Sequence, residues 1–89
     1  MTRTILITGG AAGIGWAAAQ LFAERGDRVV IADLEGADTR AAELGPTHLG
    51  IALDITDEAA VREAFSQIGT VDVLVNNAGI GDTHLPSIE

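Results

Sequence analysis

The sequence contains no cysteine, no tyrosine and no lysine, and each absence excludes a class of chemistry. Without cysteine the chain can form no disulfide, offer no thiolate nucleophile and build no metal site on sulfur. Without tyrosine and lysine, histidine is the remaining side chain suited to donating a proton near neutral pH. The histidines, His48 and His84, have no acid–base partner near them in the sequence, and no Asp or His has the spacing of metal ligands. We therefore expect no catalytic residue and no metal site.

Positive charge and long apolar runs are also scarce. The five basic residues, all arginine, stand against 13 acidic residues, and the net charge of −8 argues against nucleic acid, whose binding needs clustered cations. No apolar run approaches the ~20 residues of a membrane-spanning helix, and the N-terminus lacks the apolar segment of a signal peptide. We expect a soluble, cytoplasmic protein whose partners are neither nucleic acid nor membrane. With 89 residues, it is one small domain at most.

A glycine-rich stretch, Thr-Gly-Gly-Ala-Ala-Gly-Ile-Gly at 8–15, is the most informative part of the chain. It lies between an apolar run and an alanine-rich segment with helical spacing, and a helix N-terminus offers unpaired N–H groups and partial positive charge to a phosphate. The register G-x-x-x-G-x-G, through Gly9, Gly13 and Gly15, fits better than G-x-G-x-x-A because its first glycine directly follows the apolar run. We predict a dinucleotide site at Gly9, Gly13, Ile14 and Gly15.

The rest of the chain alternates between short apolar runs and segments of helical period. Strands are predicted over 4–8, 28–33, 47–53 and 71–75, and helices over 14–25, 36–45 and 56–68, followed by an irregular tail at about 80–89. The buried face of the first helix is predicted to carry Ile14, Ala17, Ala18, Leu21 and Phe22, and that of the third Val61, Ala64, Phe65 and Ile68, with Thr56 as the N-cap of the third helix. The order β-α-β-α-β-α-β predicts an α/β fold with an open, mostly parallel sheet.

Polar residues follow the predicted strands, where parallel sheets bind their ligands. Asp33 lies 18 positions after Gly15, close to the offset at which an acid meets the adenosine ribose. A carboxylate there accepts bonds from the diol and repels a 2′-phosphate, and its neighbours Ala12 and Leu34 carry no charge, so the pattern favours NAD over NADP. A solvated Asp at a strand end is the alternative. Asp54, with Ile55, could meet the adenine, although an acid before a helix is equally common.

Together, TGGAAGIG at 8–15, Asp33, DITD at 54–57 and NNAG at 76–79 resemble the short-chain dehydrogenase/reductase family, over essentially the whole chain. The resemblance implies a Rossmann-like, three-layer parallel sheet with strand order 3-2-1-4. It further implies pyrophosphate at Gly9 to Gly15, ribose at Asp33 and Leu34, adenine near Asp54 and Ile55, and a turn beside the cofactor, bracing the central strands, formed by Asn76, Asn77, Ala78 and Gly79.

The tyrosine and lysine that the family uses for catalysis are missing from this sequence. In the family, catalysis depends on a Tyr-x-x-x-Lys pair and a preceding serine, in chains of roughly 250 residues. We expect residues 1–89 to form a single, incomplete NAD-binding domain of an NAD(H)-dependent oxidoreductase that moves hydride between NAD and an alcohol or carbonyl substrate, and we expect this chain alone to be inactive. The alternatives are a non-catalytic nucleotide-binding or self-associating module, and a truncated chain that folds only with its missing half.

Two further residue patterns concern the surface. Val71, Val73, Leu74 and Val75 are predicted to form an apolar sheet edge, and such edges recruit further strands, so we expect self-association through the fourth strand. Trp16, the single tryptophan, lies off the apolar stripe of its helix. We expect it to be half-exposed, with a packing or partner contact as the alternative.

Overall fold

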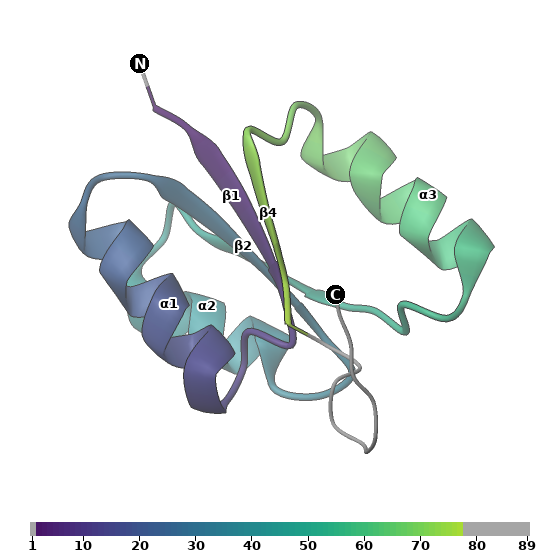
Figure 1. Cartoon of the computed structure of the whole chain (residues 1–89), viewed down its shortest axis with the longest axis horizontal. Coiled ribbons are helices and arrows are strands. Elements are labelled where there is room, and N and C mark those ends of the chain that lie inside the picture. The colour runs from purple at the N-terminus through teal and green to yellow at the C-terminus, as the bar shows by residue number, and fades with distance from the viewer. Residues whose placement is uncertain (1, 78–89) are drawn as a thin grey trace.

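The computed structural model describes residues 2–77, and its elements alternate between strand and helix as predicted (Figure 1). They are β1 (Thr4–Thr8), α1 (Gly13–Glu24), β2 (Arg28–Asp33), α2 (Ala37–Leu44), β3 (Leu49–Ala52), α3 (Glu58–Ile68) and β4 (Val73–Asn76). The third strand, β3, is shorter at both ends than the predicted range 47–53. The fourth strand, β4, begins and ends later than the predicted range 71–75. The tail predicted at 80–89 lies outside the described residues.

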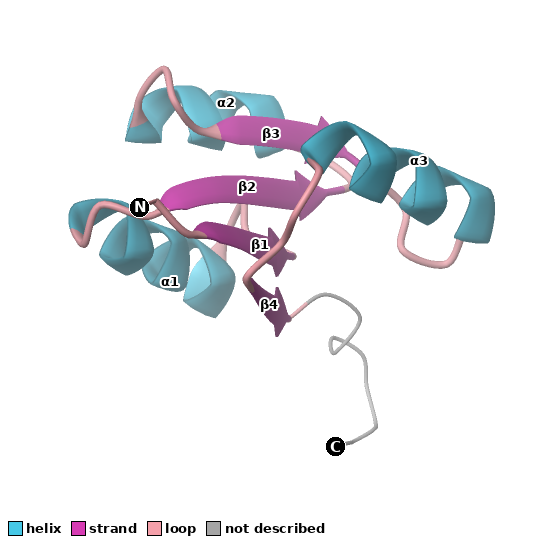
Figure 2. Cartoon of the chain, turned by 90° about the horizontal axis from the view of Figure 1, so that it is seen from above, coloured by secondary structure: helices cyan, strands magenta, loops and turns pink. Residues whose placement is uncertain are grey.

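The four strands form one parallel sheet in the order β3-β2-β1-β4, which confirms the predicted order 3-2-1-4. The register pairs Ile7 with Ile31 on one side and with Val75 on the other. The helices α1 and α2 cover one face of the sheet and α3 lies on the other, so that the fold has three layers (Figures 1 and 2). The carboxyl ends of all strands therefore meet at one edge of the sheet.

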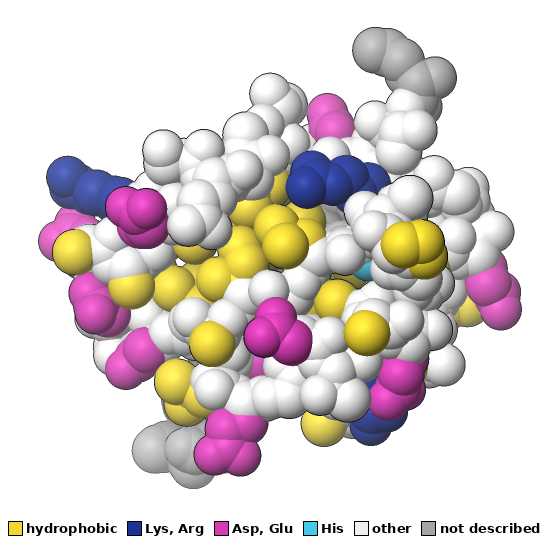
Figure 3. Space-filling model, turned by 180° about the vertical axis from the view of Figure 1, so that it is seen from behind, with side chains coloured by type: hydrophobic (Ala, Val, Ile, Leu, Met, Phe, Trp, Pro, Cys, Tyr) yellow, Lys and Arg dark blue, Asp and Glu magenta, His cyan; other side chains and the backbone are white. Residues whose placement is uncertain are grey.

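Every residue of β1 is buried because helices cover both faces of the sheet. Alternate strand residues enter different clusters. On the face of α1 and α2 the buried cluster consists of Ile5, Ile7, Ala19, Val29, Ile31 and Ala37. On the face of α3 it consists of Leu6, Val30, Ala32, Leu53, Ala64 and Ile68, and its partly buried neighbours include Leu49, Ile51 and Val61. Hydrophobic side chains remain visible in the middle of the surface seen from behind (Figure 3).

The predicted buried faces of two helices are partly wrong. In α1, Ile14 is 81% exposed and Leu21 is 61% exposed, whereas Gly15 and Ala19 are buried. The helix turns its small residues towards the sheet because its first turn packs directly against the backbone at the end of β1. In α3, Phe65 is 40% exposed, and the buried residues are Ala64 and Ile68.

The predicted N-cap of α3 is also wrong. Asp57, not Thr56, is the N-cap, and its side chain accepts the N–H of Ala60 at 3.1 Å. Thr56 lies one residue too early for this role because α3 begins at Glu58, and its hydroxyl and its N–H both donate to the Asp54 carboxylate, at 2.6 and 2.9 Å. None of the helices in residues 2–77 has the length and apolar character to cross a bilayer.

Candidate functional site

The glycine turn connects the end of β1 to the start of α1. The backbone N–H of Gly9 donates to the carbonyl of Ala32 at 2.7 Å, which ties the turn to β2. Gly9 and Gly13 both have positive φ, 69° and 59°, and a Cβ at Gly13 would meet no atom of the described residues within 4 Å. Among residues 2–77 no side chain caps α1, and the first turn of this helix has no acidic residue. The N–H groups at the start of this helix are therefore not bonded to a capping side chain of the described residues, and such groups can bind an anion.

Gly15, unlike Gly13, has no room for a side chain. A Cβ at Gly15 would collide with the carbonyl oxygen of Gly9 and lie 2.8 Å from Nδ2 of Asn77. That Nδ2 donates to the same Gly9 carbonyl at 3.1 Å, and the N–H of Asn77 donates to Oγ1 of Thr8 at 3.0 Å. The end of β4 thus packs against the turn. Oγ1 of Thr8 also donates to Oδ1 of Asn76, at 3.1 Å. The other two residues predicted for this turn, Ala78 and Gly79, lie outside the described residues.

The carboxylate of Asp33, at the end of β2, accepts hydrogen bonds from two backbone N–H groups. Its Oδ2 accepts the N–H of Ala11 at 3.1 Å, and its Oδ1 accepts the N–H of Leu34 at 2.8 Å. An ionised carboxylate has about four lone-pair sites, so this half-exposed side chain keeps accepting capacity on its open side. The two bonds fix its orientation.

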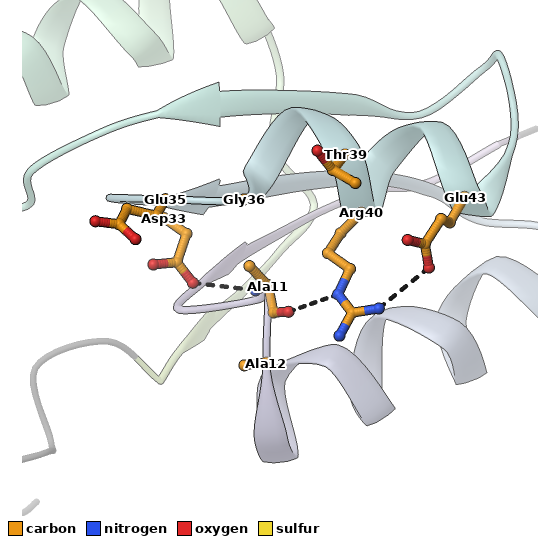
Figure 4. Close-up of a pocket in the computed structure, with 8 residues that line it drawn as sticks. All are labelled: Ala11, Ala12, Asp33, Glu35, Gly36, Thr39, Arg40 and Glu43. Carbon is orange, nitrogen blue, oxygen red and sulfur yellow. Dashed lines mark hydrogen bonds and ion pairs between the residues drawn. The ribbon is translucent and has the colours of Figure 1, made fainter.

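Two hollows share the Asp33 side chain. The smaller, of about 350 Å³, is lined by Gly9, Ala32, Asp33, Leu34, Leu53, Asp54, Ile55 and Thr56. The larger, of about 450 Å³, is lined by Ala11, Ala12, Asp33, Glu35, Gly36, Thr39, Arg40 and Glu43 (Figure 4). The smaller hollow brings together Asp33, Leu34, Asp54 and Ile55, which the sequence placed at the ends of two different strands. Leucine and isoleucine side chains line it together with the two carboxylates.

Asp54 lines the smaller hollow, and its carboxylate also holds the chain that enters α3. The hydrogen bonds from Thr56 hold the pKa of the Asp54 carboxyl below its usual range, because they favour the ionised form. Asp54 therefore has the structural role expected of an acid before a helix, and it contributes a fixed negative charge to the hollow.

Sequence reasoning missed Arg40. Its Nε donates to the carbonyl of Ala11 at 2.8 Å, one terminal nitrogen pairs with Glu43 at 3.1 Å, and its guanidinium carbon lies 4.5 Å from the centre of the Trp16 ring. Trp16 is partly buried and packs against the core, so it is both half-exposed and engaged in packing. Only the spacing of Arg40 and Glu43 was visible in the sequence, since the other two contacts join segments far apart.

His48 holds the amino end of β2, away from the site. Its Nδ1 accepts the N–H of Val29 at 3.0 Å. Burial lowers the pKa of the imidazole, and the positive charge of Arg28 adds to this effect. His84 lies outside the described residues, and within 2–77 no three His, Cys, Asp or Glu side chains group together as metal ligands would.

Known proteins similar to this chain are dehydrogenases and reductases. Sorbitol dehydrogenase of Cereibacter sphaeroides is 46% identical over 86 residues, which cover 90% of this chain and 34% of that protein. Galactitol 2-dehydrogenase of Agrobacterium fabrum is 44% identical, with the same shares covered. The crystal structure of 3-ketoacyl-(acyl-carrier-protein) reductase from Brucella melitensis, complexed with NADH, matches with a TM-score of 0.77 at 46% identity, covering 89% of this chain and 35% of that chain.

The chain thus spans about a third of the length of the curated relatives that it matches. The family model described as short chain dehydrogenase matches residues 3–88, and with this match over nearly its whole length the chain belongs to the short chain dehydrogenase family.

Proposed function

We propose that residues 1–89 form a single, incomplete NAD-binding domain of an oxidoreductase that moves hydride between NAD and an alcohol or carbonyl substrate. The observation that carries the proposal is the Asp33 carboxylate, oriented by two backbone N–H groups beside an uncapped helix start. Family membership supports it, as does the bound NADH of the similar Brucella melitensis reductase.

The pyrophosphate would lie at Gly9, Gly13, Ile14 and Gly15. Gly13 leaves the space in front of α1 open, and the close contact at Gly15 brings the helix start against the turn. The chain has no lysine to meet the phosphate charge. Backbone N–H groups and the helix dipole, equivalent to roughly half a positive charge, would provide the binding.

The adenosine would lie over the smaller hollow. In our proposal the open side of Asp33 accepts the ribose hydroxyls next to Leu34, and the adenine lies near Asp54 and Ile55. A 2′-phosphate would bring further negative charge against the Asp33 carboxylate, so the site takes NAD rather than NADP. The turn of Asn76, Asn77, Ala78 and Gly79 would lie beside the cofactor.

NAD, when bound, supplies the hydride acceptor, and the residues of this chain bind and orient it. Proton transfer to or from the substrate oxygen needs a group that residues 2–77 do not offer at the site. The sequence has no tyrosine or lysine, and Nδ1 of His48 is engaged with Val29. We propose that the chain alone is inactive and that the substrate is handled by residues outside this sequence.

Calorimetric titration of the chain with NADH and with NADPH tests the proposal. We expect saturable binding of NADH with a Kd at least about tenfold lower than that for NADPH, the ratio that one charge-assisted contact gives. Absence of binding would refute the cofactor site. Tighter binding of NADPH would refute the role of Asp33.

A second function, a self-associating module, is favoured by β4. This strand pairs with β1 alone among the described residues, and it is the outer strand of the sheet (Figure 2). The side chain of Leu74 in its middle is 53% exposed. We propose that two copies of the chain pair through this edge, as exposed apolar edges do. Light scattering tests this, and a monodisperse monomer at high concentration would contradict it.

A further inference from the structure

The peptide groups of Ala11 are held from two sides by side chains of opposite charge. The N–H of Ala11 donates to Asp33, at the end of β2, and its carbonyl accepts from Nε of Arg40, in α2 (Figure 4). Ala11 is buried and directly precedes Ala12, the N-cap of α1. The two bonds therefore fix the direction in which the chain enters the helix.

The Arg40 side chain is itself held firmly. Its guanidinium stacks on Trp16, in the first turn of α1, and pairs with Glu43, one turn further along α2. Stacking on an aromatic ring and a planar set of donors in fixed directions are properties of arginine that lysine lacks. Arg40 thus connects α2, the glycine turn and the first turn of α1 through one rigid group.

We propose that Arg40 is a positioning residue for the cofactor turn, acting through the Ala11 carbonyl and not by contact with the phosphates. This inference rests on the proposed function. The turn contains Gly9, Gly10 and Gly13, which permit many backbone conformations. By holding Ala11, Arg40 keeps the turn in the conformation that presents the N–H groups of α1 to an anion, and a preorganised site binds more tightly.

The proposal predicts different cofactor affinities for two substitutions of Arg40. In Arg40→Gln the side-chain amide nitrogen takes the place of Nε, so a donor to Ala11 remains although the charge is lost. In Arg40→Lys the charge remains, but the donor lies one atom further out. If Arg40 acts by positioning, glutamine preserves cofactor affinity better than lysine does; if it acts by attracting phosphate, the order is reversed.

The experiment is a calorimetric titration of the wild-type chain and its variants with NADH, ADP and adenosine. We expect Arg40→Ala to weaken NADH and ADP about tenfold, the effect of losing one charge-assisted hydrogen bond. Arg40→Gln should stay within about threefold of the wild type for both ligands. Adenosine has no phosphate for the turn, so all variants should bind it like the wild type. The matched control is Arg62→Ala, which removes an arginine paired with Glu58 on the other face of the sheet.

A better retention of affinity by Arg40→Lys than by Arg40→Gln would overturn the proposal, as would an equal loss for all three ligands. Failure of the wild-type chain to bind NADH and ADP would refute the proposed function instead. In that case the amide NMR signals of Gly13 and Gly15 decide: Arg40→Ala should shift them and Arg40→Gln should not. Unshifted signals in Arg40→Ala would overturn the positioning role regardless of any ligand.

Discussion

The imidazole of His48 accepts the backbone N–H of Val29 at 3.0 Å and so joins the segment before β3 to β2. The accepting Nδ1 must carry no proton, and burial lowers the pKa of this histidine below its ordinary 6.5. The unfolded chain therefore binds a proton at a higher pH than the folded chain does. The stability that this contact contributes is present above the ordinary pKa and is lost as the pH falls through it towards the folded pKa.

We predict that the melting temperature falls when the pH is lowered from about 7.5 to about 5.5. His48→Asn, whose side-chain oxygen can accept the same bond without titrating, should remove most of this pH dependence. Thermal unfolding followed by circular dichroism provides the measurement, and an undiminished pH dependence in His48→Asn would show that another group is responsible.

Asp33→Asn should weaken NADH binding about tenfold while leaving NADPH binding similar or improved, since the substitution removes the charge that opposes a 2′-phosphate. The asparagine oxygen can still accept the N–H of Ala11, so the turn should keep its conformation. Glu35→Gln is the control, because Glu35 lines only the larger hollow beside Asp33. Titration with both cofactors measures the ratio, and an unchanged preference for NADH would contradict the prediction.

Gly15→Ala should destabilise the fold by about 3 kcal/mol, because the added methyl group collides with the carbonyl of Gly9, a backbone group that cannot rotate away as a side chain can. Gly13→Ala meets no neighbouring atom, and only its positive φ opposes it, at a cost of about 1 kcal/mol. Urea unfolding of both variants compares the two costs. Equal losses of stability in the two variants would contradict the close contact between Gly15 and the Gly9 carbonyl.

Leu74→Lys should shift the chain towards monomer if the outer edge of β4 mediates self-association, since a lysine on an edge strand opposes strand addition. Leu21→Lys is the control, because Leu21 is comparably exposed but lies on α1. Sedimentation velocity over a range of concentrations measures the effect. If both variants behave alike, the contact lies elsewhere.

The layout of the sheet and the convergence of its polar strand ends could be predicted from the sequence. The first three apolar runs each end next to a glycine or an acid, as at Asp33, and each is followed by a segment of helical period, which leaves a parallel sheet as the simple solution. The buried face of α1 could not be predicted in this way. Periodicity gives weight to large apolar residues such as Ile14 and Leu21, whereas close contact with the β1 end selects Gly15 and Ala19 for their small size.

The contacts of Arg40 could not be predicted from the sequence for a different reason. Its principal partner is the carbonyl of Ala11, and a backbone group has no residue type that a sequence pattern could reveal. The N-cap of α3 depends on where the helix begins: Thr56 is a suitable capping residue by type, but α3 begins at Glu58, and the side chain of Asp57 directly before it accepts the N–H of Ala60. Both contacts depend on local geometry that residue types alone do not determine.

The position of β4 beside β1 also affects how the chain folds. The N–H of Asp72 donates to the carbonyl of Thr4 and its carboxylate accepts the N–H of Thr4, 68 residues away in sequence. During synthesis β1 emerges first, yet one of its two edges stays unpaired until the chain is complete to Asn76. Closing so large a loop carries an entropic cost before any contact compensates for it. Docking of β4 is therefore expected to be the slow step of folding, and β1 is the segment most exposed to misassociation until it occurs.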